Sequence, residues 1–382
     1  MPSPQERTEN EVLLLCVSSE FAPQQQDRLR ALVTGNLDWD YFYNLARRHS
    51  LVPLVFSQLN QSVKESVPPA ALQRFRKAYQ ENAARNVIFA DELTSLIKAL
   101  DEAEVETIVF KGPALAVAAY GDLALRRFVD LDVMVRRADV TRAIEVLSAR
   151  GYAFARPLDP EQQAILLRTQ HNLQFTRGRL IVELHWQVAA ELFAASVTAE
   201  ELWKNLDTVL VNKTEVKTFA TEDLLFSLCV HGSRHLWQRL AWICDIDRII
   251  AMQTNIDWPR LIERARQAKA ERMFLLGPAL AANLLGTPVP DTVAETITRD
   301  SKIDSIVTEI RARIFDGTEQ VPAGLGTIFR YNYRIRSDWR SRLRYCRHML
   351  DPTDSDVESI RLSRPLHFVY YLLRPFRLLR NN

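Results

Sequence analysis

The sequence contains few cysteines and few glycines for its length of 382 residues. Its four cysteines stand at positions 16, 229, 244 and 346, without the close spacing of a metal-binding cluster. We therefore expect reduced thiols and a cytoplasmic protein. With only eleven glycines, the chain can form few tight turns, which favours a mainly helical fold with few hairpins.

Long apolar segments and an excess of one charge are also missing. No apolar run reaches the roughly 18–20 residues of a membrane-spanning helix, and the N-terminus lacks a basic region followed by an apolar stretch, so we expect no secretory signal. The 49 basic and 47 acidic residues give a net charge of +2, which argues against binding to bulk nucleic acid. The sequence has no internal repeat and no low-complexity segment.

The pattern of apolar residues predicts a fold of the α+β class. Residues 1–104 and 191–382 carry mostly helical periodicity, whereas residues 105–190 contain the predicted strands. We expect a small mixed β-sheet core flanked by N-terminal and C-terminal helical regions, with one further small hairpin over 209–219. A chain of this length can hold two or three domains.

The most informative segment is the predicted strand over residues 128–135, which contains Asp130 and Asp132. Side chains alternate between the two faces of a strand, so both aspartates are predicted on one face and Val129 and Leu131 on the core-facing side. Two carboxylates so close repel each other unless a cation lies between them. Mg²⁺ suits this place because it prefers oxygen ligands; two solvated acids at a strand edge are the alternative.

A second candidate segment precedes this strand. An apolar strand over 105–110 ends in Lys111-Gly112-Pro113, and an alanine-rich helix follows. The start of a helix after a glycine turn presents free N–H groups to phosphate, and Lys111 adds a positive charge there. Arg126 and Arg127 lie just before the acidic strand, where they could contact phosphate or form structural ion pairs.

Two further strands are predicted over 171–176 and 180–186, joined by a turn at residues 177–179. Glu183 lies in the second strand among apolar neighbours, where a lone carboxylate is costly to bury. A nearby metal would explain it, and an exposed strand face is the alternative. His185 shares its face; it could orient Glu183 or contact substrate, but a structural histidine is favoured.

The C-terminal region contains weaker candidates. His231 and His235 share one face of a predicted helix that begins near residue 221. Their spacing can bind zinc, but no third ligand is evident, which favours substrate contact or core packing. Asp245 lies on the next predicted helix. The tail over 365–380 mixes aromatic residues with arginines and could either touch an anionic membrane surface weakly or dock on the body.

Together these elements resemble the nucleotidyltransferase superfamily of the DNA polymerase β type. There a glycine turn opens a short helix, an acid-x-acid pair follows on the next strand, and a third acid lies on a neighbouring strand. More narrowly, the chain resembles a family of uncharacterised nucleotidyltransferases, often encoded among bacterial polysaccharide or peptide natural-product biosynthesis genes. The segments that carry this resemblance are Lys111-Gly112, Tyr120-Gly121, Arg126 to Asp132, Glu183 to Trp186, His231 to Asp245 and Arg374 to Arg377.

The resemblance implies an enzyme that moves a nucleoside monophosphate from an NTP to an unknown acceptor: a small molecule, sugar, peptide or RNA. Asp130, Asp132 and Glu183 would be catalytic and would hold Mg²⁺. The residues implied in nucleotide binding are Lys111, Gly112, Arg126, His231 and Asp245.

The sequence departs from the superfamily pattern at the glycine turn. Gly112-Pro113 replaces the usual Gly-Gly or Gly-Ser, and the gap from Gly112 to Asp130 is long. A non-catalytic protein of the same fold, which binds a nucleotide or a partner, is the alternative function.

Overall fold

The structure is a computed structural model that describes residues 7–155, 158–187, 199–253, 255–316 and 324–349, with positions 369 and 374. The arginine-rich tail over 365–380 therefore lies outside the described residues, apart from these two positions. The first helices are α1 (Thr8–Val17), α2 (Pro23–Val33), α3 (Trp39–Arg48), α4 (Val52–Ser62), the short 3-10 helix η2 (Lys64–Ser66) and α5 (Pro69–Glu102).

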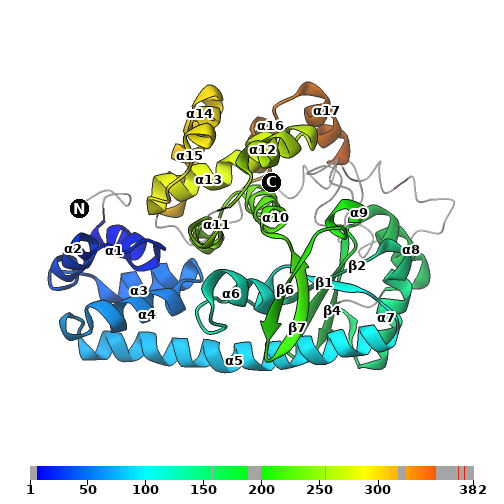
Figure 1. The fold of residues 1–382 in the computed structure, drawn as a ribbon, viewed down its shortest axis with the longest axis horizontal. Coiled ribbons are helices and arrows are strands. Elements are labelled where there is room, and N and C mark those ends of the chain that lie inside the picture. The colour runs from blue at the N-terminus through cyan, green and yellow to red at the C-terminus, as the bar shows by residue number, and fades with distance from the viewer. Residues whose placement is uncertain are drawn as a thin grey trace.

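Helix α5 joins the first helices to the sheet. It contains no glycine, and its only proline, Pro69, occupies the first turn, where a missing N–H costs nothing. Leu72 and Phe75 near its start pack with the first helices, whereas Leu93 and Leu100 near its end pack in the core of the sheet. Figure 1 shows α5 running along one side of the molecule.

The main sheet is mixed, as predicted for an α+β fold. Its strands lie in the order β1-β2-β5-β4-β3. Strands β2 and β5 are parallel, and the other neighbouring pairs are antiparallel. The strands are β1 (Thr107–Val109), β2 (Leu131–Val135), β3 (Ala153–Phe154), β4 (Asn172–Arg177) and β5 (Leu180–His185). The helices between them are α6 (Gly112–Tyr120), the 3-10 helix η3 (Arg137–Asp139), α7 (Val140–Ala149) and α8 (Pro160–Thr169).

Both predicted hairpins are confirmed. Strands β4 and β5 turn at Gly178, which has a φ of +60°. The second hairpin pairs β6 (Leu206–Val211) with β7 (Thr214–Phe219). Its two turn residues, Asn212 and Lys213, have φ values of +47° and +67°, and a two-residue turn with both φ angles positive matches the twist of the flanking strands.

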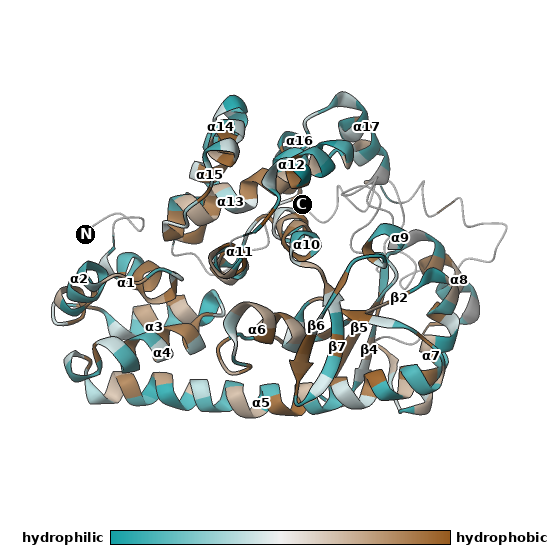
Figure 2. Cartoon of the chain, in the orientation of Figure 1, coloured by the Kyte–Doolittle hydropathy of each residue, from teal (hydrophilic) through white to brown (hydrophobic). Residues whose placement is uncertain are grey.

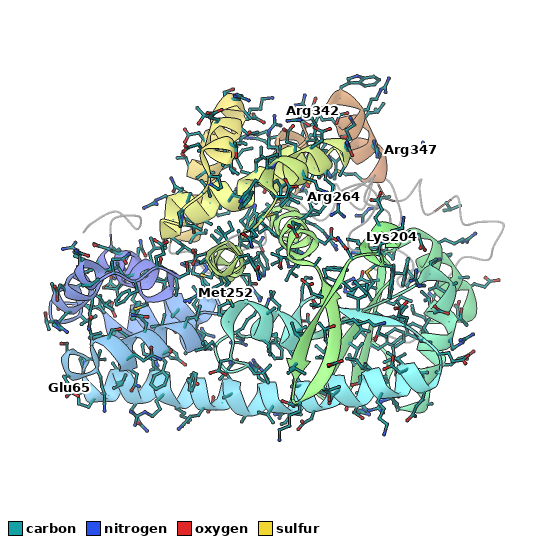
Figure 3. The ribbon with its side chains drawn as sticks, in the orientation of Figure 1. Glu65, Lys204, Met252, Arg264, Arg342 and Arg347 are labelled. Atoms are coloured by element: carbon teal, nitrogen blue, oxygen red, sulfur yellow. The ribbon has the colours of Figure 1, made fainter. Side chains whose placement is uncertain are left out.

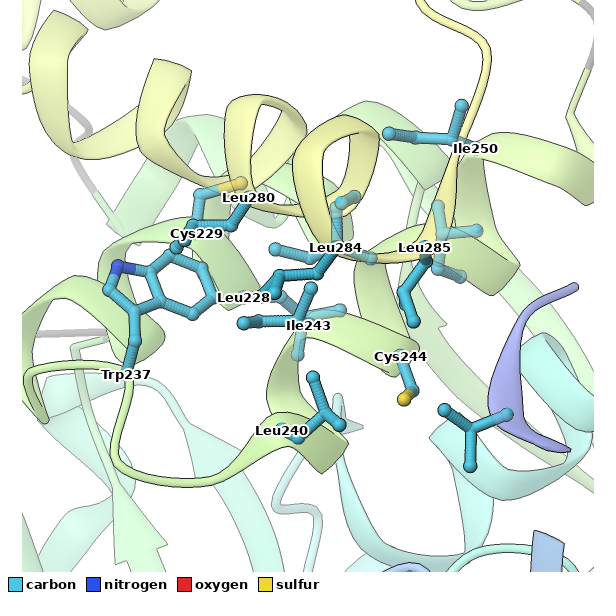
Figure 4. Close-up of a cluster of buried hydrophobic side chains, with 14 of the residues drawn as sticks. Leu228, Cys229, Trp237, Leu240, Ile243, Cys244, Ile250, Leu280, Leu284 and Leu285 are labelled. Carbon is cyan, nitrogen blue, oxygen red and sulfur yellow. The ribbon is translucent and has the colours of Figure 1, made fainter. Parts of the chain in front are cut away.

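The remaining helices, except α17, contribute residues to one large core. They are α9 (Ala199–Leu202), α10 (Thr221–Arg234), α11 (Leu240–Met252), α12 (Trp258–Gln267), α13 (Glu271–Leu285), α14 (Asp291–Arg299), α15 (Ser301–Ile314), α16 (Leu325–Arg334) and α17 (Trp339–His348). Leu228, Ile243 and Leu284 from α10, α11 and α13 point toward one another there (Figure 4). Exposed side chains such as Glu65, Lys204 and Arg347 project from the surface of the molecule (Figure 3).

The sheet lies between two hydrophobic cores. On one face, Val133 of β2 and Leu184 of β5 pack with α5 and α7. On the other, Ile108 and Met134 join the large helical core. Figure 2 shows hydrophobic residues gathered on the strands and on α11 and α13, whereas α17 is mostly hydrophilic. Within the described ranges no helix is both long and apolar enough to cross a membrane, and the four cysteines are unpaired.

His49 connects the first helices to the C-terminal helices. It ends α3, and its side chain is buried. Its Nε2 lies 3.1 Å from the carbonyl oxygen of Ile314, and its Nδ1 accepts a hydrogen bond of 3.2 Å from the N–H of Leu240. The ring is therefore neutral, with its proton on Nε2. Burial, together with the nearby charge of Arg48, lowers the pKa of His49 to about 3.

We expect His49→Asn to reduce the loss of stability on acidification. Unfolded His49 binds a proton near its ordinary pKa of 6.5, but folded His49 only near about 3. Between these values the unfolded state binds more protons, so the free energy of unfolding falls as the pH falls. From pH 7 to pH 5 this site contributes a loss of about 2 kcal/mol. Urea denaturation of both proteins at the two pH values measures the difference, and equal losses would contradict the expectation.

Candidate active site

Two carboxylates meet on one face of the sheet because β2 and β5 are parallel neighbours. Asp132 of β2 stands directly opposite Glu183 of β5. The Nε2 of His185, two residues further along β5, lies 3.1 Å from Oδ1 of Asp132 and 3.4 Å from Oε2 of Glu183. One ligand atom from each of these three residues lies within 4.8 Å of the others. Such a group has the spacing of metal ligands.

Asp130 lies just before β2 and lines the same cavity as Asp132 and Glu183. The predicted strand over 128–135 is shorter in the structure, because regular pairing begins only at Leu131. The prediction that Val129 faces the core is wrong, since its side chain is 41% exposed and lines the cavity.

The charges around the acids give them different proton affinities. Burial raises the pKa of Asp130, and repulsion by Asp132 and Glu183 raises it further, to about 6, despite Lys111 and Arg126. Burial also disfavours ionised Asp132, but attraction to Lys111 and a hydrogen bond from His185 outweigh it, so the pKa of Asp132 is lowered. The site therefore contains one acid that titrates near neutral pH beside one that stays ionised.

Lys111 and His185 both contact Asp132. The Nζ of Lys111 lies 3.2 Å from its Oδ1. Burial lowers the pKa of His185, but its hydrogen bonds to Asp132 and Glu183 outweigh this and raise it. The sequence favours a structural role for His185. In the structure its ring bridges the two carboxylates and holds them in one orientation.

Gly112 brings the start of α6 close to the acids. Its φ is +54°, a conformation that favours glycine, and an added Cβ would lie 3.2 Å from the carbonyl oxygen of Asp130. Pro113 follows in the first turn of α6, where proline is tolerated. Lys111 and Gly112 both line the cavity. The helix ends at Gly121 in the left-handed conformation, as its sequence predicts.

Arg126 and Asp245 pair with each other. Arg126 donates from Nε and Nη2 to the two carboxylate oxygens of Asp245, at 2.9 and 3.0 Å, and the hydroxyl of Tyr120 donates to Asp245 at 2.7 Å. Burial opposes the charge of Arg126, but attraction to Asp245 outweighs it and raises the pKa of Arg126. Arg126 lines the cavity, whereas Asp245 is almost fully buried behind it and is not part of the lining.

His231 and His235 form another wall of the cavity with Trp242. The ring centroids lie 4.6 Å apart between the histidines, and 5.2 and 5.5 Å from Trp242. Burial and nearby positive charges lower the pKa of both histidines, that of His235 to about 4. Both rings are therefore neutral at pH 7. In the described residues these histidines belong to no group with metal-ligand spacing, so they form an aromatic surface instead.

Sequence reasoning missed two groups at the site. Asn172 donates from Nδ2 to Oε2 of Glu183 at 3.1 Å, and it stands opposite His185 in the β4–β5 pairing. Continuing the predicted pairing of the two strands from their turn at 177–179 to the other end of the hairpin would have placed Asn172 opposite His185. Arg234 of α10 contacts Nε2 of His171 at 2.7 Å and lines the cavity. No local pattern in the sequence indicates this second contact, because it joins residues 63 positions apart.

The fold is that of a nucleotidyltransferase domain: a mixed sheet with acids on adjacent parallel strands, preceded by a glycine turn and a short helix. Residues 35–286 match the family described as uncharacterised nucleotidyltransferases, and the chain belongs to this family. A search among curated proteins finds no match. The matched region contains all eight site residues predicted from the sequence.

We expect Asp245→Asn to lower the free energy of unfolding by about 3–5 kcal/mol, because it leaves the guanidinium of Arg126 buried without a counter-charge. Urea denaturation measures the loss. Asp207→Asn, on exposed β6, is the matched control. If Asp245→Asn is as stable as the control, the ion pair does not stabilise the fold.

Proposed function

We propose that this protein is a divalent-metal-dependent nucleotidyltransferase that moves a nucleoside monophosphate from an NTP to an acceptor, with release of pyrophosphate. One observation carries the proposal: Asp132 and Glu183 lie side by side on parallel strands, with Asp130 in the same cavity. The family match supports the reaction class. A place in bacterial natural-product or polysaccharide biosynthesis is part of the proposal.

The side chains of the site fit a hard divalent cation. Three carboxylates converge on one cavity, and a buried acid cluster of this kind needs a positive charge. Asp130, Asp132 and Glu183 would hold the ion, which we propose to be Mg²⁺ because it prefers oxygen ligands. When bound, it would neutralise charge on the phosphate oxygens and on the leaving pyrophosphate.

The other residues would position the substrates. Lys111, Gly112 and the first N–H groups of α6 would bind the β- and γ-phosphates. Asp245 holds the side chain of Arg126 in place, and Arg126 would then contribute a fixed positive charge that positions the NTP. His231 would offer a flat, neutral ring beside the nucleotide. His185 and Asn172 would keep the carboxylates oriented.

In the reaction, the acceptor oxygen attacks the α-phosphorus, and the bond from that phosphorus to the oxygen bridging to the β-phosphate breaks. The acceptor proton passes to a carboxylate. Glu183 is the candidate, because a bound ion would remove the repulsion that raises the pKa of Asp130. Asp132 has a lowered pKa and would remain ionised throughout.

A non-catalytic binding protein of the same fold is the second candidate. The contact of Lys111 with Asp132 favours it, because a lysine side chain already supplies positive charge to that acid. Gly112-Pro113 also replaces the usual turn. Such a protein would bind a nucleotide or a partner without turnover.

We expect Asp130→Asn with Asp132→Asn to abolish Mg²⁺-dependent release of pyrophosphate, tested with each of the four NTPs and a cell extract as the source of acceptor. Removing both carboxylates removes the ion's ligands, so Mn²⁺ binding, followed by electron paramagnetic resonance, should be lost as well. Asp207→Asn serves as the control, and circular dichroism checks the fold.

Turnover that persists in the double variant would reject the assignment of these acids. Nucleotide binding by the wild type without turnover, measured by calorimetry, would favour the non-catalytic candidate.

A further inference from the structure

Two arginines of the cavity lining lie close enough for their charges to repel each other. Arg127 lies in the segment between α6 and β2, and Arg239 is the residue before α11. Both side chains are exposed to the cavity or its mouth. Ser50, just after α3, lines the same cavity. Three distant parts of the chain therefore contribute to the lining of this cavity.

The other cations of the lining are already engaged by the protein. Lys111 contacts Asp132, Arg126 is paired with Asp245, and Arg234 contacts His171. By contrast, no carboxylate in the described part of the chain forms an ion pair with Arg127 or Arg239. The guanidinium of Arg239 lies over the ring of Trp242, 5.9 Å from its centroid.

The charges around Arg127 are of its own sign. Partial burial in the cavity wall lowers the pKa of Arg127, and repulsion by Arg239 and Arg47 lowers it further. Like charges that gather without a counter-ion destabilise one another. A bound anion would remove this repulsion, and two guanidinium groups suit the oxygens of a phosphate or a carboxylate.

This arginine pair differs from the group of cations that serves the acids. The positive side chains that act on Asp130 are Lys111 and Arg126, whereas those that act on Arg127 are Arg239 and Arg47. The NTP phosphates have to lie at the acids, since the metal ion would be held there. The neutral rings of His231, His235 and Trp242 form part of the same lining.

We propose that Arg127 and Arg239 bind an anionic group of the acceptor, a phosphate or a carboxylate, while the rings of His235 and Trp242 contact the rest of that molecule. This inference rests on the proposed nucleotidyl transfer for the position of the NTP at the acids and for the identity of the bound anion as part of the acceptor. The anion site itself is defined by side chains that the proposed metal and NTP sites do not use. The substrate class is thus an acceptor that carries negative charge in addition to its reacting group.

The test uses inorganic phosphate and acetate as probes of the full chain, with calorimetry and thermal unfolding as readouts. We expect phosphate, acetate or both to bind the wild type and raise its unfolding temperature. Arg127→Gln with Arg239→Gln should weaken this binding by about tenfold or more. In anion-free buffer the same double variant should unfold at a higher temperature than the wild type, because the repulsion is relieved.

The matched control is Arg179→Gln with Arg260→Gln, which changes two exposed arginines outside the cavity. It should bind the probes as the wild type does. Preference for phosphate over acetate would identify a phosphorylated acceptor, and the reverse a carboxylic acid.

Two results would overturn the inference: no binding that depends on the arginine pair, or anion binding that is lost in Lys111→Gln and kept in the Arg127→Gln, Arg239→Gln variant. Asp130→Asn with Asp132→Asn separates the two proposals, because it should stop turnover and leave anion binding in place. Anion binding that depends on the two arginines, without any turnover, would therefore contradict the proposed reaction and support the proposed anion site.

Discussion

The parallel pairing of β2 with β5 forces Asp132 and Glu183 to face each other in a partly buried cavity. Negative charges so close are unfavourable unless positive groups surround them. The neighbouring structure meets this need. Lys111 reaches Asp132 from the glycine turn, and His185 bridges both acids. Gly112 permits the turn to approach so closely, since any side chain there would crowd the backbone of Asp130. The arrangement of the site thus follows from the repulsion between these two carboxylates.

The helical parts of the chain complete the site and fix its width. Ser50 follows the end of α3, His231 and Trp242 lie on α10 and α11, and His235 directly follows α10. His49, next to Ser50, is hydrogen-bonded to the C-terminal helices. Arg126 and Asp245 form a second link, between the segment before β2 and α11. These two buried contacts hold the helices that line the cavity in place relative to the sheet.

Much of the fold was predictable because its signals are local. Alternating apolar residues indicated the strands, the turn at 177–179 indicated the β4–β5 hairpin, and the helix after Gly112 ended at Gly121. The period of a strand also placed Glu183 and His185 on one face. The exact start of β2 was not predictable, because Asp130 lies where the backbone leaves the sheet. The Arg126–Asp245 pair was not predictable either, since it spans 119 positions and depends on how α11 packs.

The order of strands has a consequence for how sequences of this kind can diverge. Strand β5 lies beside β2, whereas α7, β3, α8 and β4 all come between them along the chain. The separation of the two acids is set by backbone hydrogen bonds between β2 and β5 and not by the length of the segment that connects these strands. Insertions or deletions between residues 136 and 171 therefore need not displace either carboxylate, so relatives can vary in this stretch while they keep the two carboxylates side by side.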